Sequence, residues 1–169
     1  AKPIDRVLVE TTTPIQKELY VAVTIDRGKA LPCIICSDAG GVEIETVARE
    51  TPEKVLTFHF DPDDDLGPER FRALIEEFKS RSKEARIKTR ELESIISKLA
   101  QLFVTMDASL VEVNPLGLMA DGALLPIDAK ITFDINALFR HPEINALQDP
   151  RQEDPREVEA KRYDLSYVG

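Results

Sequence analysis

The stretch LVEVNPLGLMADGALLPIDAK, residues 110–130, sets two apolar runs around an Asp-Gly pair and therefore predicts a β-hairpin. Four polar residues interrupt runs that could otherwise be buried strands, namely Glu112, Asn114, Asp128 and Lys130. An unpaired buried polar group costs about 1 to 3 kcal/mol. These side chains therefore either satisfy one another or face a ligand.

The turn of this hairpin determines which polar side chains face each other. In a three-residue loop at residues 120–122, with Gly122 in the left-handed conformation, Asn114 lies across from Asp128 on one face. A two-residue Asp-Gly turn would place them on opposite faces. Two hard oxygen donors at that spacing suit magnesium, which takes few protein ligands and fills its shell with water and phosphate oxygens. A cross-strand hydrogen bond without metal is the alternative.

The composition limits the classes of partner. The chain has 169 residues, 43% of them hydrophobic, so it can bury one sizeable core in one domain. With 31 acidic and 22 basic residues, and a formal charge of −9, we expect neither nucleic acid nor a membrane as partner. No apolar run approaches the roughly 18 residues of a spanning helix, and the first residues lack a secretory signal. We expect an intracellular protein. Because apolar residues begin at once and no Met precedes them, we also expect a piece of a longer chain.

Periodicity predicts several strands and helices along the chain. Strands are expected at residues 5–10, 17–26, 30–36 and 55–60, and helices at residues 68–79 and 85–106. The second helix carries an apolar stripe that we interpret as core packing: Leu92, Ile95, Ile96, Leu99, Phe103 and Met106. A hairpin at residues 109–133 and a short helix with a loop follow. A last helix begins with Asp154 as N-cap, Pro155 at N1 and Glu157 at N3.

Three local patterns are weaker guides. The loop at residues 27–29 predicts a hairpin turn with positive φ at Gly28, because the spacing of a phosphate-binding loop is absent. The acidic run DPDDDLG, residues 61–67, lacks the closing Glu of a calcium loop, so we expect it to be solvated. Cys33 and Cys36 lie on a strand, where residues three apart point to opposite faces, which favours two buried thiols over a redox or zinc site.

The motifs LVEVNPLGL, PIDAKITFDINALFRHPEI, QEDPRE and AKRYDLSYVG resemble the nucleotide-binding part of the β subunit of succinate–CoA ligases. LVET, KELYVAVTIDR and GGVEIETVA resemble the preceding part of the same subunit, in the same order. The resemblance covers nearly the whole chain and is weakest at residues 61–90. It implies an α+β fold of the ATP-grasp type, with an antiparallel or mixed sheet and packed helices. Residues 1–169 would form a partial ATP-grasp domain without the lid subdomain and the CoA-ligase domain.

The resemblance also implies site residues. Asn114 and Asp128 match the family's Mg²⁺ ligands, and Glu10 and Glu18 match residues that contact the nucleotide, which is ATP/ADP or GTP/GDP. Glu112 matches a catalytic acidic residue near an arriving phosphohistidine, where a carboxylate favours the protonated imidazole.

The implied reaction interconverts succinyl-CoA, phosphate and nucleoside diphosphate with succinate, CoA and nucleoside triphosphate. The phosphohistidine belongs to a partner α subunit, and CoA and succinate bind elsewhere in the complex, in the bacterial cytoplasm or the mitochondrial matrix. We assign no catalytic role to His59 or His141, and we expect the fragment alone to be inactive.

Two alternatives stay open. The first is a related acyl-CoA ligase with the same grasp domain, such as malate–CoA ligase. The second is a non-enzymatic ATP-grasp-like domain that binds another protein and uses the polar hairpin structurally.

Overall fold

The computed structural model describes residues 4, 6–84, 86–163, 165 and 167, and the chain divides into two compact units. Residues 13–137 form one unit, which we call the sheet unit. Residues 1–12 and 138–169 form the other, which we call the terminal unit. Each unit is described by itself.

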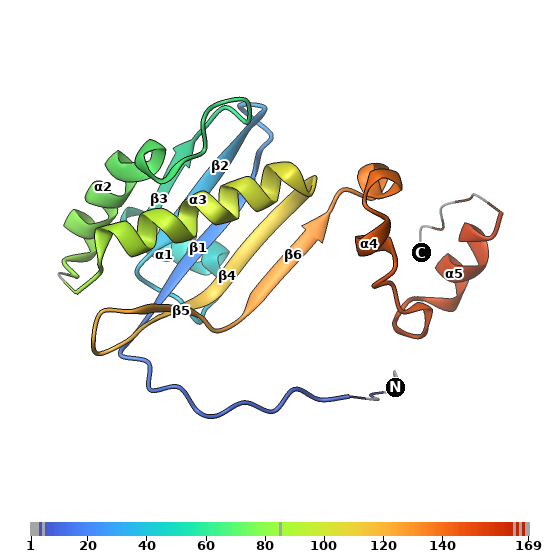
Figure 1. Cartoon of the computed structure of the whole chain (residues 1–169), viewed down its shortest axis with the longest axis horizontal. Helices are drawn as coiled ribbons and strands as arrows, with labels where there is room; N and C mark the ends of the chain where they lie inside the picture. The colour runs from blue at the N-terminus through green and yellow to red at the C-terminus, as the bar shows by residue number, and fades with distance from the viewer. Residues whose placement is uncertain (1–3, 5, 85, 164, 166, 168–169) are drawn as a thin grey trace. The chain divides into compact units, whose positions relative to one another are not determined.

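The sheet unit is built on a six-stranded antiparallel sheet of order β3-β2-β1-β4-β5, in which β6 also pairs with β4 (Figure 1). Its strands are β1 (Lys17–Asp26), β2 (Leu31–Ser37), β3 (Val55–His59), β4 (Ala108–Leu118), β5 (Leu124–Pro126) and β6 (Ala129–Phe133). Four expected strand regions are confirmed, at residues 17–26, 30–36 and 55–60 and in the hairpin at 109–133. The expected antiparallel sheet is confirmed with them.

Two helices cover one face of the sheet. These are α2 (Arg72–Ser82), which follows the 3₁₀ turn η2 (Pro68–Phe71), and α3 (Thr89–Thr105). The stripe of α3 packs as expected from Leu92 to Phe103, with Leu92 and Ile96 fully buried in the core. Its expected last member, Met106, is the C-cap that follows the helix and lies outside the core cluster. The helix begins four residues later than the expected residue 85. Lys83 takes a left-handed conformation (φ 53°) that ends α2, and Glu84 accepts a hydrogen bond from the Arg86 backbone N–H, so a turn precedes the helix.

A third helix, α1 (Ile44–Glu50), lies on the opposite face of the sheet, behind it in Figure 1. A short 3₁₀ turn, η1 (Pro52–Lys54), leads from it into β3. The two faces therefore differ, because α2 and α3 cover one with apolar side chains while the other keeps polar groups accessible.

The turn between β1 and β2 differs from the expectation. Asp26 pairs with Leu31, so the loop has four residues, and Ala30 rather than Gly28 takes the positive φ, at 54°. The Asp26 carboxylate accepts hydrogen bonds from the backbone N–H groups of Gly28 (2.9 Å) and Lys29 (3.2 Å). This side chain holds the first part of the loop, so the left-handed residue is the last one before β2.

The two cysteines are free and buried, as expected, and burial raises the pKa of Cys36 to about 12. In the described part of the chain, every helix is too short or too polar to span a bilayer.

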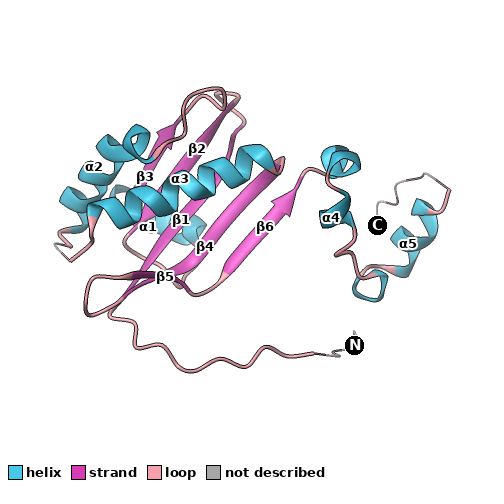
Figure 2. Cartoon of the chain, in the orientation of Figure 1, coloured by secondary structure: helices cyan, strands magenta, loops and turns pink. Residues whose placement is uncertain are grey.

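The terminal unit contains short helices and an extended segment. The expected strand at residues 5–10 is wrong for the residues described there, which form no strand and appear as loop in Figure 2. A strand needs a neighbour for its main-chain hydrogen bonds, and in the described chain none pairs with this segment. Asp5 lies outside the described residues.

The expected short helix after the hairpin is confirmed as η3 (Ile135–Arg140), which extends from the sheet unit, and α4 (Pro142–Asn145). A 3₁₀ turn, η4 (Pro150–Gln152), precedes α5 (Pro155–Lys161). The Asp154 side chain accepts a hydrogen bond from the Arg156 N–H, which confirms it as the N-cap of α5.

Gly122 should be needed for the stability of the sheet unit. Its φ is +80°, and a Cβ there would lie 2.5 Å from the Arg86 carbonyl oxygen. We expect Gly122→Ala to lower the free energy of unfolding by about 1 to 3 kcal/mol, measured by urea denaturation. The matched control is Gly67→Ala, because Gly67 has φ −60° and its nearest added contact, at 3.3 Å, is the Asp65 side chain. Equal losses in the two variants would contradict this account.

Candidate functional site

A pocket of about 600 Å³ lies on the face of the sheet opposite α2 and α3. Strands β1, β2, β4 and the β6 hairpin supply its floor, and the start of α1 supplies one wall. Its lining is largely polar: Tyr20, Thr24, Ile35, Glu43, Ile44, Glu45, Leu110, Glu112, Asn114, Asp128 and Lys130. All of these residues belong to the sheet unit.

Alternation along β4 turns Glu112 and Asn114 toward this pocket, and an irregularity after them keeps the following apolar residues in the core. Leu19 pairs with Leu116 and Val21 with Val113, so β4 has one more residue than β1 between these pairs. Such a bulge shifts the alternation of faces by one residue. Before it, Val113 points into the core and Asn114 faces the pocket, and the shift of one residue returns Leu116 to the core face. A proline is tolerated at such a position, because a bulge leaves one residue outside the ladder.

The hairpin register follows the expectation. Met119 donates to Ala123 across a three-residue loop, and Gly122 takes the positive φ. The Asn114 N–H donates to the Asp128 carbonyl at 3.1 Å, and Glu112 pairs with Lys130. Asn114 and Asp128 both line the pocket, so the predicted shared face is confirmed.

The Asn114 amide is held by three hydrogen bonds. Its Oδ1 accepts from the Gly41 N–H at 2.7 Å, and its Nδ2 donates to the Val42 carbonyl at 3.1 Å and to Glu112 Oε1 at 3.4 Å. The loop between β2 and α1 therefore meets β4 at this side chain.

The charges of the pocket are mostly negative. Four carboxylates line it, from Glu43, Glu45, Glu112 and Asp128, against one ammonium group, from Lys130. Tyr20 is buried among them, and its pKa is raised above the usual value first by burial and then by the Glu112 carboxylate. An anion entering this pocket would be repelled, whereas a cation would be attracted.

The donor set fits a magnesium ion that carries phosphate ligands. In the described chain, no three or more His, Cys, Asp and Glu side chains form a metal-binding group. Magnesium differs from calcium in this respect, since it keeps several waters and uses one or two carboxylates together with substrate phosphates. An Asn oxygen and an Asp carboxylate on one face satisfy that need, and the role of Asn114 and Asp128 as ligands stays a prediction.

The other expected site residues occupy different places. Glu18 lies exposed on β1 beside Gly41, where a Cβ on the glycine would be 2.1 Å from its Oε2. Glu10 is exposed in the terminal unit and lies on no strand, so the strand expected to carry it is wrong. Their contact with nucleotide stays a prediction.

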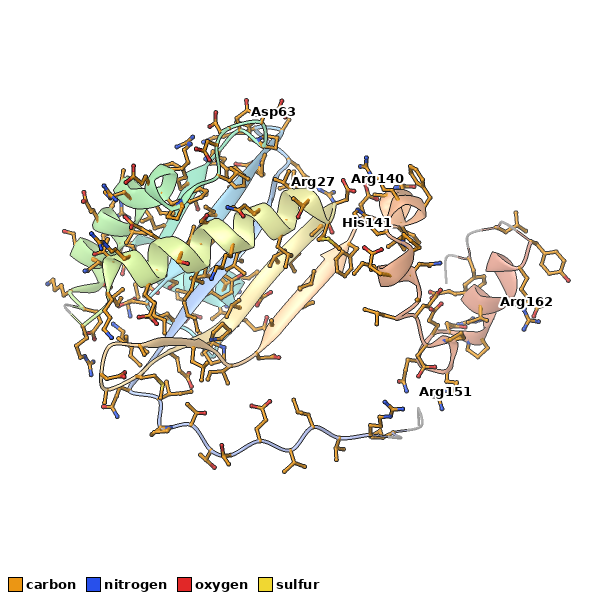
Figure 3. The ribbon with its side chains drawn as sticks, viewed as in Figure 1. Arg27, Asp63, Arg140, His141, Arg151 and Arg162 are labelled. Atoms are coloured by element: carbon orange, nitrogen blue, oxygen red, sulfur yellow. The ribbon has the colours of Figure 1, made fainter. Side chains whose placement is uncertain are left out.

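The loops that we judged to be structural lie away from the pocket. Arg27 and Asp63, labelled in Figure 3, lie in the loops at the end of the sheet unit where β2 begins and β3 ends, and neither lines the pocket. In the acidic loop, Asp64 pairs with Arg70 at 2.9 Å. His59 pairs with Asp26 at 2.7 Å, and this contact lowers the Asp26 pKa.

Three of the lining residues with titratable side chains were not expected from sequence: Tyr20, Glu43 and Glu45. The sequence contains a signal for Tyr20, because this residue lies two positions from Glu18 on β1 and so shares its strand face. The sequence contains no such signal for Glu43 and Glu45, because their positions depend on the course of the loop before α1.

The sequence and the fold define the class of protein. The sequence model of the ATP-grasp domain family matches residues 1–118, which is more than half of the chain. The chain therefore belongs to the ATP-grasp domain family, and the expected fold class is confirmed.

Individual relatives show which members of this family the chain is similar to. The chain is 44% identical over 167 residues to the succinate–CoA ligase [ADP-forming] subunit beta of Aquifex aeolicus, covering 99% of this chain and 42% of the relative. It is 42% identical over 173 residues to the subunit of the same name from Persephonella marina, covering 98% of this chain and 42% of the relative. The resemblance to this subunit is confirmed, and the chain spans about two fifths of the length of these relatives.

Two solved structures share the fold. One is an ATP citrate lyase from Methanothrix soehngenii in complex with citrate and coenzyme A, with a TM-score of 0.61 and 21% identity, covering 92% of this chain and 34% of that one. The other is a dinucleotide-forming acetyl-coenzyme A synthetase 1 from Ca. Korarchaeum cryptofilum in complex with coenzyme A and Mg-AMPPCP. Its TM-score is 0.52 at 16% identity, and the match covers 72% of this chain and 55% of that one.

Tyr20 should make the stability of the chain sensitive to alkaline pH. Its folded pKa is raised above the unfolded value of about 10, so its stabilising effect is complete below about pH 10 and is lost as pH rises toward the folded pKa. We expect the wild type to lose up to about 1.4 kcal/mol per pH unit relative to Tyr20→Phe in that window. Urea unfolding of both proteins at about pH 8 and about pH 11 measures this. Parallel losses would show that Tyr20 ionises equally in both states.

Proposed function

We propose that the chain is the nucleotide- and magnesium-binding portion of the β subunit of a succinate–CoA ligase. The enzyme would convert succinyl-CoA, phosphate and nucleoside diphosphate into succinate, CoA and nucleoside triphosphate, and the reverse. The observation that carries the proposal is the joint placement of Asn114 and Asp128 in one acidic pocket of an ATP-grasp fold. The names of the relatives support the same reaction.

The pocket residues would divide the work of binding a phosphate-bearing nucleotide. Asn114 and Asp128 would hold magnesium through oxygen, and bound magnesium neutralises charge on the phosphates. Without a cation, the four lining carboxylates would oppose phosphate binding. Glu112 would be the catalytic carboxylate near the incoming phosphohistidine, where its charge favours the protonated imidazole.

The nucleotide would be ADP or ATP. The relatives are named as ADP-forming enzymes, which supports this nucleotide over GDP or GTP. Glu10 and Glu18 would contact the nucleotide. The phosphohistidine would come from a partner α subunit, and CoA and succinate would bind elsewhere in the complex. Residues 1–169 would then be a partial ATP-grasp domain of a longer subunit, and the lid subdomain and CoA-ligase domain would belong to other segments of it. The bacterial relatives support a bacterial cytoplasm over a mitochondrial matrix.

The test is reconstitution of the complete β subunit with its α subunit. Thiokinase rates with succinate or malate, and with ADP or GDP, should show preference for succinate and ADP. A preference for malate would identify a sibling acyl-CoA ligase. Magnesium-dependent nucleotide binding without turnover on either acid would exclude both ligases, and no nucleotide binding would favour a protein-binding domain.

Asp128 should be needed for phosphoryl transfer and not for folding. In the complete enzyme we expect Asp128→Asn to keep the thermal midpoint and to lose about a hundredfold or more of the phosphoryl-transfer rate, because a neutral amide holds a divalent cation less well. The matched control is Asp63→Asn, which makes the same chemical change in the acidic loop, outside the pocket. Wild-type turnover in Asp128→Asn would contradict the assignment.

Glu10 and Glu18 should affect the nucleotide step. We expect the double variant with Gln at both positions to raise the nucleotide KM while leaving the thermal midpoint nearly unchanged, because both side chains are exposed. Each single variant shows whether one glutamate accounts for the effect. An unchanged nucleotide KM in all three variants would identify both as solvent-facing carboxylates.

A further inference from the structure

The loop at residues 38–43, between β2 and α1, reaches across the sheet to β4. Its contact with β4 is the Asn114 amide, which accepts from the Gly41 N–H at 2.7 Å and donates to the Val42 carbonyl at 3.1 Å. These two partners are of opposite kind, one a donor and one an acceptor. They therefore select one of the two orientations of the amide, because a flipped amide would face N–H with N–H and oxygen with oxygen.

Two glycines allow the loop to come this close. Gly40 donates its N–H to the Glu18 carbonyl at 3.0 Å, and a Cβ there would lie 2.4 Å from the Leu19 carbonyl oxygen. Gly41 has φ +69°, a conformation that side chains rarely adopt. The glycine pair thus fixes the loop against β1 through the main chain and presents the Gly41 N–H to Asn114.

The consequence for Asn114 is a side chain with one defined orientation. Both hydrogens of its Nδ2 have acceptors, since Glu112 Oε1 lies at 3.4 Å in addition to the Val42 carbonyl. Its Oδ1 has two lone pairs, of which the Gly41 N–H uses one. The second lone pair is left for a cation, on the side chain that lines the acidic pocket.

We infer that Gly40 and Gly41 are positioning residues for magnesium, which act by fixing the Asn114 amide with its oxygen ready for the ion. This inference rests on the proposed function, in which Asn114 is a magnesium ligand. A ligand that is already oriented loses less side-chain freedom when it binds, so the loop raises the affinity for the cation without touching it.

The contact itself can be tested without nucleotide. In the 169-residue chain, hydrogen exchange of the Gly41 amide is followed by NMR in the wild type and in Asn114→Ala. Loss of the acceptor should speed exchange of this amide by about tenfold, the equivalent of one ordinary hydrogen bond. The Gly40 amide, bonded to Glu18, is the internal control and should change little. An unchanged Gly41 rate would overturn the inference.

The effect on the cation is tested in the complete β subunit with its α partner, using Mn²⁺ as the probe at saturating ADP. Gly41→Ala should weaken Mn²⁺ binding by about tenfold, again the equivalent of one hydrogen bond. Gly41→Asn is the matched control: its Cβ meets the flexible end of Glu18 in the same way, at 2.1 Å, but Asn tolerates positive φ. It should bind Mn²⁺ more tightly than Gly41→Ala does.

A double-mutant cycle decides whether Gly41 acts through Asn114. In the Asn114→Ala background, Gly41→Ala should cause no further loss of Mn²⁺ affinity. Additive losses would show an independent effect and overturn the inference, as would wild-type affinity in Gly41→Ala. A wild-type complex that binds no Mn²⁺ with ADP would instead refute the proposed function and with it the positioning role, whereas the exchange experiment would still report on the contact.

Discussion

The register of β4 against its neighbours determines where every polar group of the pocket lies. On one side the three-residue loop ending at Gly122 sets the pairing with β5 and β6. On the other side the bulge at Asn114 and Pro115 sets the pairing with β1. A shift of one residue in either would move Asn114 into the core face, where an amide without partners is costly. The pocket and the apolar core are therefore consequences of the same register.

The pocket gathers charges that the core could not hold. Its carboxylates lie on the sheet face that α2 and α3 leave accessible, while apolar residues of the same strands fill the other face. Their mutual repulsion is tolerated because solvent reaches them. The pKa of the Tyr20 phenol among them is raised first by burial and then by the Glu112 carboxylate. The site is thus arranged for a cation before any anion, which agrees with a nucleotide that arrives with its metal.

The hairpin could be predicted from sequence because its signals are local and agree with one another. Gly122 indicates the loop type, and the apolar residues change parity between Val113 and Leu116. The absence of a strand among the described residues of the segment 5–10 could not be predicted. Alternation of apolar residues shows that a segment is able to form a strand, but it does not show that a partner strand is present. The prediction of a positive φ at Gly28 was wrong for a related reason. The side chain of Asp26, outside the turn, determines which loop residue is left-handed.

The candidate site was predicted only in part, because local sequence signals place the residues of one hairpin but not those of other segments. Side chains related by one hairpin were brought together correctly, as the shared pocket of Asn114 and Asp128 shows. Groups delivered by another segment, such as Glu43, depend on a tertiary contact that no periodicity records. The family resemblance supplied roles for Asn114 and Asp128, but it did not indicate the contact between Gly41 and Asn114.

The extended segment near the start of the chain has a consequence for handling the protein. Val7, Leu8 and Val9 are 77 to 85% exposed, and in the described chain no strand pairs with their main chain. Exposed β-branched residues beside free main-chain donors and acceptors form a template for strand pairing between molecules. At high concentration the separate chain would therefore self-associate through this segment, and charged substitutions at these positions would oppose its aggregation.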